Sequence, residues 1–131
     1  MTTVKNALNV TGIAFAVYHV TDVAAARKFY GETLGLQICA EMEFAPGKWW
    51  IEFDAGPSAL AITNFEVPNA NVGKSPGVAL EVANYDEALA LIRAAGIGFS
   101  SGPNEYPVCR SCAVKDPDGN DLYLHCRKPR A

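Results

Sequence analysis

The sequence predicts an α+β fold built from two tandem βαβββ units. Strand and helix patterns follow one another in the same order twice, and a stretch rich in Pro, Gly and Asn separates the two copies. Corresponding residues of the two copies lie 62 positions apart. For example, Asp54 and Asp116 each precede a turn, and 116 − 54 = 62. Two copies at this spacing indicate an internal duplication and not a repeat array.

The first unit has a helix that begins after Asp22, whose side-chain oxygen can cap it. The helix is predicted over 23–34, where apolar residues recur with a helical period, and Gly35 ends it. Turns that contain Gly and Pro separate the later strands. The predicted strands of this unit are 13–20, 36–44, 48–54 and 59–65.

The second unit repeats this plan after a linker at 66–75. Asn84 can cap a helix over 85–95, Glu87 can complete a capping box, and Gly96 stops the helix. The predicted strands of this unit are 78–82, a short strand or edge at 96–100, 107–115 and 121–126.

A single domain is expected over residues 1–131, with the two copies at 11–65 and 76–126. Each unit would cover one face of its sheet with a helix and leave the other face open. Two such units can curve around a shared cleft of mixed β-sheet, with the helices on the outer face.

The charge and hydropathy of the chain exclude several classes of partner. A formal net charge of -3 and a pI near 5.3 leave no basic surplus for a phosphate backbone, so no nucleic-acid partner is expected. Apolar runs are too short to cross a bilayer, so no membrane partner is expected. The N-terminal residues lack a long apolar signal segment, which favours a cytoplasmic location.

The four cysteines are predicted to be free structural thiols. Cys109 and Cys112 have the spacing of a redox motif, but they lie in a predicted strand. A separation of three residues in a strand puts the two side chains on opposite faces. A redox pair of this kind instead needs its first cysteine at a helix N-terminus.

The repeated unit, the segment "VTDVAAARKFYGETLGL" (20–36) and the turn "DPDGN" (116–120) together resemble the vicinal oxygen chelate superfamily, over about residues 11–126. This superfamily includes glyoxalase I, extradiol dioxygenases and the bleomycin-resistance proteins. The resemblance implies a cleft between the concave sheets, with metal ligands at equivalent positions of both units in the metal-dependent members.

The resemblance places the four metal-ligand positions at Phe15, Ala61, Gly77 and Tyr123. Three of these residues have no side-chain donor, and a tyrosine phenol must lose a proton with a pKa near 10 before it binds a divalent ion well. The family's metal site is therefore expected to be absent, and no cofactor is expected.

The remaining candidates are ligand-binding residues of the cleft. Trp50 and Glu52 share one strand face, Tyr123 and His125 share another, and a tryptophan beside a carboxylate can hold a planar cation. Arg110 could contact an anion, although a solvated strand residue is the simpler interpretation. A His19–His125–Glu52 cluster is conceivable, but nothing in the spacing requires it. The predicted site consists of Phe15, His19, Trp50, Glu52, Ala61, Gly77, Arg110, Tyr123 and His125.

Three functions remain open at this stage. The first is a metal-free protein that sequesters a small aromatic or hydrophobic ligand in the cleft. The second is an enzyme of the same superfamily, a lyase, isomerase or dioxygenase that uses a relocated metal or a histidine base. The third is an interaction role with an occluded cleft. The resemblance also implies a homodimer.

Overall fold

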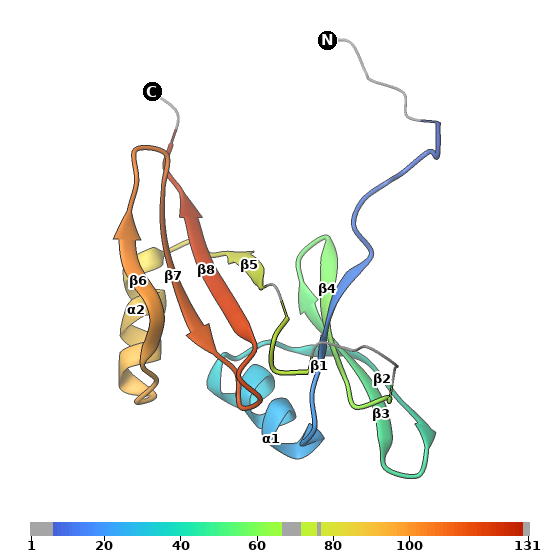
Figure 1. The fold of residues 1–131 in the computed structure, drawn as a ribbon. Coiled ribbons are helices and arrows are strands. Elements are labelled where there is room, and N and C mark those ends of the chain that lie inside the picture. Colours follow the sequence, from blue (N-terminus) through green and yellow to red (C-terminus); the bar gives the residue numbers. More distant parts are fainter. Residues whose placement is uncertain (1–6, 67–71, 76, 130–131) are drawn as a thin grey trace.

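Two four-stranded sheets form the body of the protein (Figure 1). The computed structural model describes residues 7–66, 72–75 and 77–129. The elements of the first unit are β1 (Phe15–His19), α1 (Val23–Arg27), the π-helix η1 (Lys28–Thr33), β2 (Ile38–Ala45), β3 (Lys48–Ala55) and β4 (Ser58–Thr63). The elements of the second unit are β5 (Val78–Glu81), α2 (Tyr85–Ala94), β6 (Phe99–Glu105), β7 (Cys109–Lys115) and β8 (Asp121–Arg127).

The two sheets have the same mixed topology. β1 lies parallel to β4, and β4, β3 and β2 continue the sheet in antiparallel pairs. β5 likewise lies parallel to β8, which continues through β7 to β6. The strand orders β1-β4-β3-β2 and β5-β8-β7-β6 confirm the predicted α+β fold of two tandem βαβββ units.

The first helix begins and ends where predicted but changes type within its length. The Asp22 side chain accepts a hydrogen bond from the Ala25 N–H at 3.0 Å, which satisfies one unpaired donor of the first turn. The chain leaves the helical segment at Gly35, which has a φ of +76°. Between these points α1 gives way to η1, a change that helical periodicity alone does not reveal.

The second helix agrees with its prediction within a residue. The Asn84 side chain accepts a hydrogen bond from the Glu87 N–H at 3.0 Å, and Tyr85, Leu89 and Ile92 face the core. In the described part of the chain, no helix combines the length and the apolar character that a membrane crossing requires.

β6 is longer than the predicted strand at 96–100 and lies further along the chain. The sequence from Gly102 to Asn104 has the composition of a turn, yet the structure includes it in the strand. The register of β6 against β7 shifts on both sides of Ser101. An edge strand with such irregularities tolerates Gly and Pro, because fewer ladder hydrogen bonds are needed there.

One hydrophobic core joins both units. Tyr18, Tyr30 and Phe53 from the first unit belong to the same buried cluster as Ile92 and Leu122 from the second. Tyr30 packs against both Tyr18 and Phe53 with ring centroids about 6 Å apart. The chain is therefore held together across the repeat by apolar burial.

The turn at 116–120 is also a polar junction between the units. The buried carboxylate of Asp116 accepts hydrogen bonds from the N–H groups of Asp118 and Asn120, from Asn120 Nδ2, and from the Tyr30 hydroxyl at 2.9 Å. Asn120 Nδ2 also donates to the His19 carbonyl at 3.3 Å. Burial raises the pKa of Tyr30, so its hydroxyl keeps the proton that it donates.

Candidate functional site

One face of the first sheet packs on the core and the other face is open. Ile51 and Ile62 are register partners and both are fully buried. Side chains alternate along a strand, so the neighbours of Ile51 along β3 and of Ile62 along β4 point to the open face. The predicted site residues that lie on this open face are Phe15, His19, Trp50, Glu52 and Ala61.

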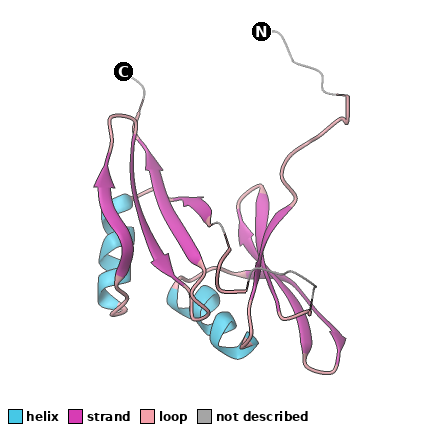
Figure 2. Cartoon of the chain, viewed as in Figure 1, coloured by secondary structure: helices cyan, strands magenta, loops and turns pink. Residues whose placement is uncertain are grey.

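The second sheet has the same arrangement. Cys112 and Leu124 are register partners and face the core. The open face carries Ala79, Glu81, Ser111, Ala113, Tyr123 and His125. The strands of the two sheets form separate groups (Figure 2).

An exposed aromatic pair lies on the first open face. The Phe15 ring meets the Trp50 ring edge to face, with centroids 5.1 Å apart, although Phe15 is 44% exposed. Trp50 Nε1 donates a hydrogen bond to the Glu52 carboxylate at 2.8 Å. This bond fixes the orientation of the indole, so the aromatic surface is already arranged for a flat partner.

On the second open face, the ring of Tyr123 lies against Gly77. Gly77 has a φ of +85°, and a Cβ added there would lie 2.6 Å from a carbon of the Tyr123 ring. The space that a larger residue at position 77 would need is therefore filled by the phenol. Tyr123 itself is 37% exposed.

A histidine and a carboxylate form a pair on the same face. His125 Nδ1 lies 2.5 Å from the Glu81 carboxylate, whose other oxygen accepts a hydrogen bond from the Arg127 N–H at 2.8 Å. The Arg127 N–H and, after it, His125 hold the pKa of Glu81 below its ordinary value. Among the described residues, His125 Nε2 has no hydrogen-bond partner, so this nitrogen faces outward.

The structure does not form the cluster of His19, His125 and Glu52 that the sequence allowed. His125 pairs with Glu81, and Glu52 accepts its hydrogen bond from Trp50. No group of three or more His, Cys, Asp or Glu residues in the described ranges is arranged to hold a metal ion.

Arg110 lies on the opposite face from the other predicted residues of its sheet. Its guanidinium lies 4.5 Å from the centre of the Tyr85 ring, beside α2, and pairs with Asp86 at 2.9 Å. Neighbouring side chains of a strand point to opposite faces, and Ser111, the residue after Arg110 in β7, points to the open face. We therefore leave Arg110 out of the candidate site.

The four positions at which the family resemblance places metal ligands do not fit a divalent ion. Phe15, Ala61 and Gly77 offer no donor atom, and the Tyr123 ring occupies the space above Gly77. A histidine side chain at position 77 would collide with that ring. We therefore derive no chemical step that passes through a metal.

The cysteines also fit the predicted structural role. All four are free, and Cys109 and Cys112 lie on opposite faces of β7. Burial raises the pKa of the Cys112 thiol, which makes it a weak nucleophile.

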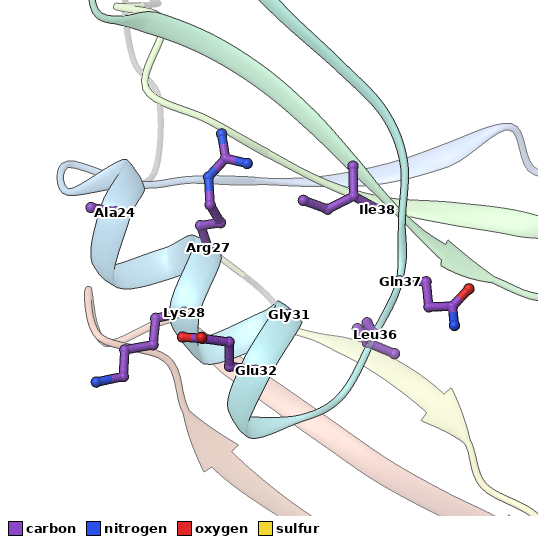
Figure 3. Close-up of a pocket in the computed structure, with 8 residues that line it drawn as sticks. All are labelled: Ala24, Arg27, Lys28, Gly31, Glu32, Leu36, Gln37 and Ile38. Atoms are coloured by element: carbon purple, nitrogen blue, oxygen red, sulfur yellow. The ribbon is translucent and has the colours of Figure 1, made fainter.

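The linings of three hollows formed by described residues contain none of the nine predicted site residues. The largest of these, about 570 Å³, lies beside α1 and η1. Figure 3 shows its walls, which consist of Ala24, Arg27, Lys28, Gly31, Glu32, Leu36, Gln37 and Ile38. Its rim carries charges of both signs and therefore favours no single ligand charge. The second hollow, of about 300 Å³, has Glu81 in its wall, and the third, of about 170 Å³, is lined by aliphatic side chains.

Glu81 is the site residue that sequence reasoning did not select. Its partner His125 lies 44 positions away, and only the parallel register of β5 and β8 brings the two together. In the first unit the same register pairs His19 with Thr63, which are the repeat equivalents of Glu81 and His125.

Two tandem βαβββ units with matching mixed sheets place this chain among duplicated α+β proteins. The profile of the Glyoxalase/Bleomycin resistance protein/Dioxygenase superfamily matches residues 12–124. The chain belongs to this superfamily. A search of the curated proteins found no match.

Solved structures of similar proteins agree in fold. An antibiotic-binding protein, TnmS3, from Streptomyces sp. CB03234 is 23% identical with a TM-score of 0.78, over 91% of this chain and 98% of that chain. A glyoxalase/bleomycin resistance protein from the same organism is 26% identical with a TM-score of 0.74, over 86% and 98%. A lactoylglutathione lyase from Agrobacterium tumefaciens is 20% identical with a TM-score of 0.72, over 89% and 94%.

Proposed function

We propose that this protein binds a small aromatic or hydrophobic molecule on its open sheet faces without using a metal. The observation that carries the proposal is the pair of Phe15, which is 44% exposed, and the half-buried Trp50, whose indole is fixed by Glu52. A preset aromatic surface loses little conformational entropy when a flat molecule stacks on it. The resemblance to a protein named as antibiotic-binding supports the same class of function.

The open face of the second sheet would supply the polar part of the site. Tyr123 lies over Gly77, and His125 is oriented by Glu81. These groups can accept or donate hydrogen bonds, whereas Phe15 and Trp50 supply apolar area. Three of the four metal-ligand positions lack a side-chain donor and the fourth, Tyr123, has only a phenol, which supports binding without a metal. His19 completes the proposed lining on the first sheet, whereas Ala61 on the same face is fully buried.

We also propose that the protein acts as a homodimer. The edge strand β2 exposes Met42 and Phe44, which are 53% and 52% exposed, and the Phe44 ring contacts Phe65 at 5.1 Å. An edge strand with apolar side chains is a surface that proteins normally cover. Light scattering of the purified protein should give twice the mass of the chain. A cytoplasmic location and the lack of a nucleic-acid partner stay predictions.

The binding proposal is tested with the dye anilinonaphthalene sulfonate and a Trp49→Phe variant, in which Trp50 is the single tryptophan. Dye binding should quench Trp50 emission, and Phe15→Ala in the same background should weaken binding about tenfold. Elemental analysis of protein purified without chelators should find less than one divalent ion per chain. A stoichiometric ion lost on Tyr123→Phe, or quenching unchanged by Phe15→Ala, would overturn the proposal.

A second candidate function is catalysis with His125 as a general base. The pairing of Nδ1 with Glu81 favours it, because a carboxylate at one ring nitrogen orients the other for proton transfer. Lyase, isomerase or dioxygenase turnover should then be abolished by His125→Ala. Activity that survives in both His125→Ala and His19→Ala would remove this candidate.

A further inference from the structure

The second hollow, of about 300 Å³, lies where the two units meet. Its walls come from β1 and the residue Ile13 before it, from the end of β3 and the start of β4, and from β5 of the second sheet. The lining residues are Ile13, Ala16, Ala55, Ser58, Ala59, Leu60, Val78, Ala79, Leu80 and Glu81. None of the nine residues of the sequence-predicted site is among them.

The walls of this hollow are held in place by hydrogen bonds between the units. The Tyr18 hydroxyl accepts a bond from the Val78 N–H at 2.7 Å and donates to the Asp121 carbonyl at 2.5 Å. Burial raises the pKa of Tyr18 to about 12, so the donated proton is retained. The start of β5 is therefore tied directly to β1, and the hollow is a preformed feature of the junction.

Glu81 is the one charged residue among the ten that line the hollow, and the other nine comprise eight aliphatic residues and Ser58. One carboxylate oxygen faces His125 Nδ1 and the other accepts the Arg127 N–H. A carboxylate oxygen has two acceptor sites, so each oxygen can still accept a further hydrogen bond. Glu81 therefore adds a negative charge held in place by two contacts to an otherwise apolar lining, at a position where its side chain is 58% exposed.

We infer that this hollow binds the ammonium group and the apolar body of a small organic cation, with Glu81 as its counter-ion. An ammonium group beside the partly exposed Glu81 gains a charge-assisted hydrogen bond while its apolar body enters the hollow, and the lining contains no basic residue. An anion of the same shape would meet the Glu81 charge and be excluded. The inference rests on the proposed function in that both concern small-molecule binding. The hollow shares Glu81 with the second open face, but its lining does not include Phe15 or Trp50.

The test compares three probes of similar shape: phenethylamine, phenethyl alcohol and phenylacetate. Calorimetric titration of the full chain should give the order amine, alcohol, acid from tightest to weakest. Glu81→Gln should weaken the amine at least about tenfold and leave the alcohol within about twofold. Glu32→Gln is the matched control, because it removes the same charge from an exposed residue that is absent from this lining, and it should change neither affinity.

A second variant covers the case in which Glu81→Gln perturbs the fold. Ala55→Leu adds bulk to the lining of the hollow and keeps Glu81, so it should abolish binding of both the amine and the alcohol while Trp50 quenching by the dye is retained. An amine that binds no tighter than the alcohol, or equal losses in Glu81→Gln and Glu32→Gln, would overturn the inference. Loss of dye quenching with intact amine binding would instead overturn only the open-face proposal.

Discussion

The open faces of the two sheets differ, although the two units share one backbone plan. The first face has an aromatic pair, Phe15 and Trp50, and its histidine stands beside Thr63. At the equivalent positions of the second face, Gly77 replaces Phe15, Tyr123 replaces Ala61, and Glu81 pairs with His125. The first face is therefore mainly aromatic, and the second is mainly polar.

The core-facing positions do not show this divergence. Leu60 and Ile62 of the first sheet correspond to Leu122 and Leu124 of the second, and all four are buried. Packing against a shared core constrains these positions in both units. The open faces carry no such constraint, so the difference between the units is concentrated where a ligand would bind.

The largest expected effect concerns an aspartate that the two units use differently. Asp116 is buried with four donors around it, whereas Asp54, its repeat equivalent, is exposed and accepts one bond from the Gly56 N–H at 3.1 Å. Asp116→Ala should lower the free energy of unfolding by about 3 kcal/mol, because buried donors lose their acceptor. Asp54→Ala should cost less than about 1 kcal/mol. Urea denaturation measures both, and equal losses would contradict a special role for the 116–120 turn.

The next effect tests the close contact on the second face. Gly77→Ala should destabilise the protein by about 2 kcal/mol, because it combines an unfavourable φ with a collision against the Tyr123 ring. Gly56 has a φ of +80° but open space around it, so Gly56→Ala should cost only about 1 kcal/mol. In a Tyr123→Ala background the ring is gone, so introducing Gly77→Ala should cost only about as much as Gly56→Ala does in the wild-type chain. A thermal unfolding series checks this, and no relief in the double variant would exclude the collision.

A smaller effect separates the two faces as binding surfaces. Trp50→Ala should weaken anilinonaphthalene sulfonate binding about tenfold, because it removes the ring that Phe15 and Glu52 hold in place. Tyr123→Ala should weaken it only about threefold, because part of that ring is occupied by its contact with Gly77. Calorimetric titration of both variants gives the ratio. A larger loss in Tyr123→Ala would move the main ligand contact to the second face.

The smallest effect is the pH dependence that Glu81 adds to the second unit. Since its pKa is lower in the folded chain than in the unfolded chain, the unfolded state binds more protons as the pH falls. Its stabilising contribution is therefore present above the ordinary carboxyl pKa of about 4.3 and is lost as the pH falls below it. Glu81→Gln should make the urea midpoint fall less steeply between about pH 5 and pH 3. An unchanged slope would show that the carboxylate gains nothing from the Arg127 N–H and His125.

Much of the fold could be predicted from local pattern. The caps at Asp22 and Asn84 act as expected, and the alternation in β3 placed Trp50 and Glu52 on one face. The extent of β6 was not predictable in this way, because its Gly102 and Pro103 have turn composition and only pairing with β7 keeps them in a strand. The sequence also did not predict that Arg110 lies on the opposite face from the site. Its side chain lies on the face of β7 that meets α2, and only the packing of α2 decides which face that is.

The sequence by itself determined the duplicated βαβββ plan, the superfamily and the lack of side-chain donors at three of the four metal-ligand positions. These features depend on periodicity and on residue identity at fixed spacings, which a linear chain displays directly. Only the tertiary structure decided that His125 pairs with Glu81 and that the Glu52 carboxylate accepts its hydrogen bond from Trp50 Nε1. It also decided that the 116–120 turn joins the two units. The physical reason is that strand register and unit packing choose among several acceptors that are equally compatible with the sequence.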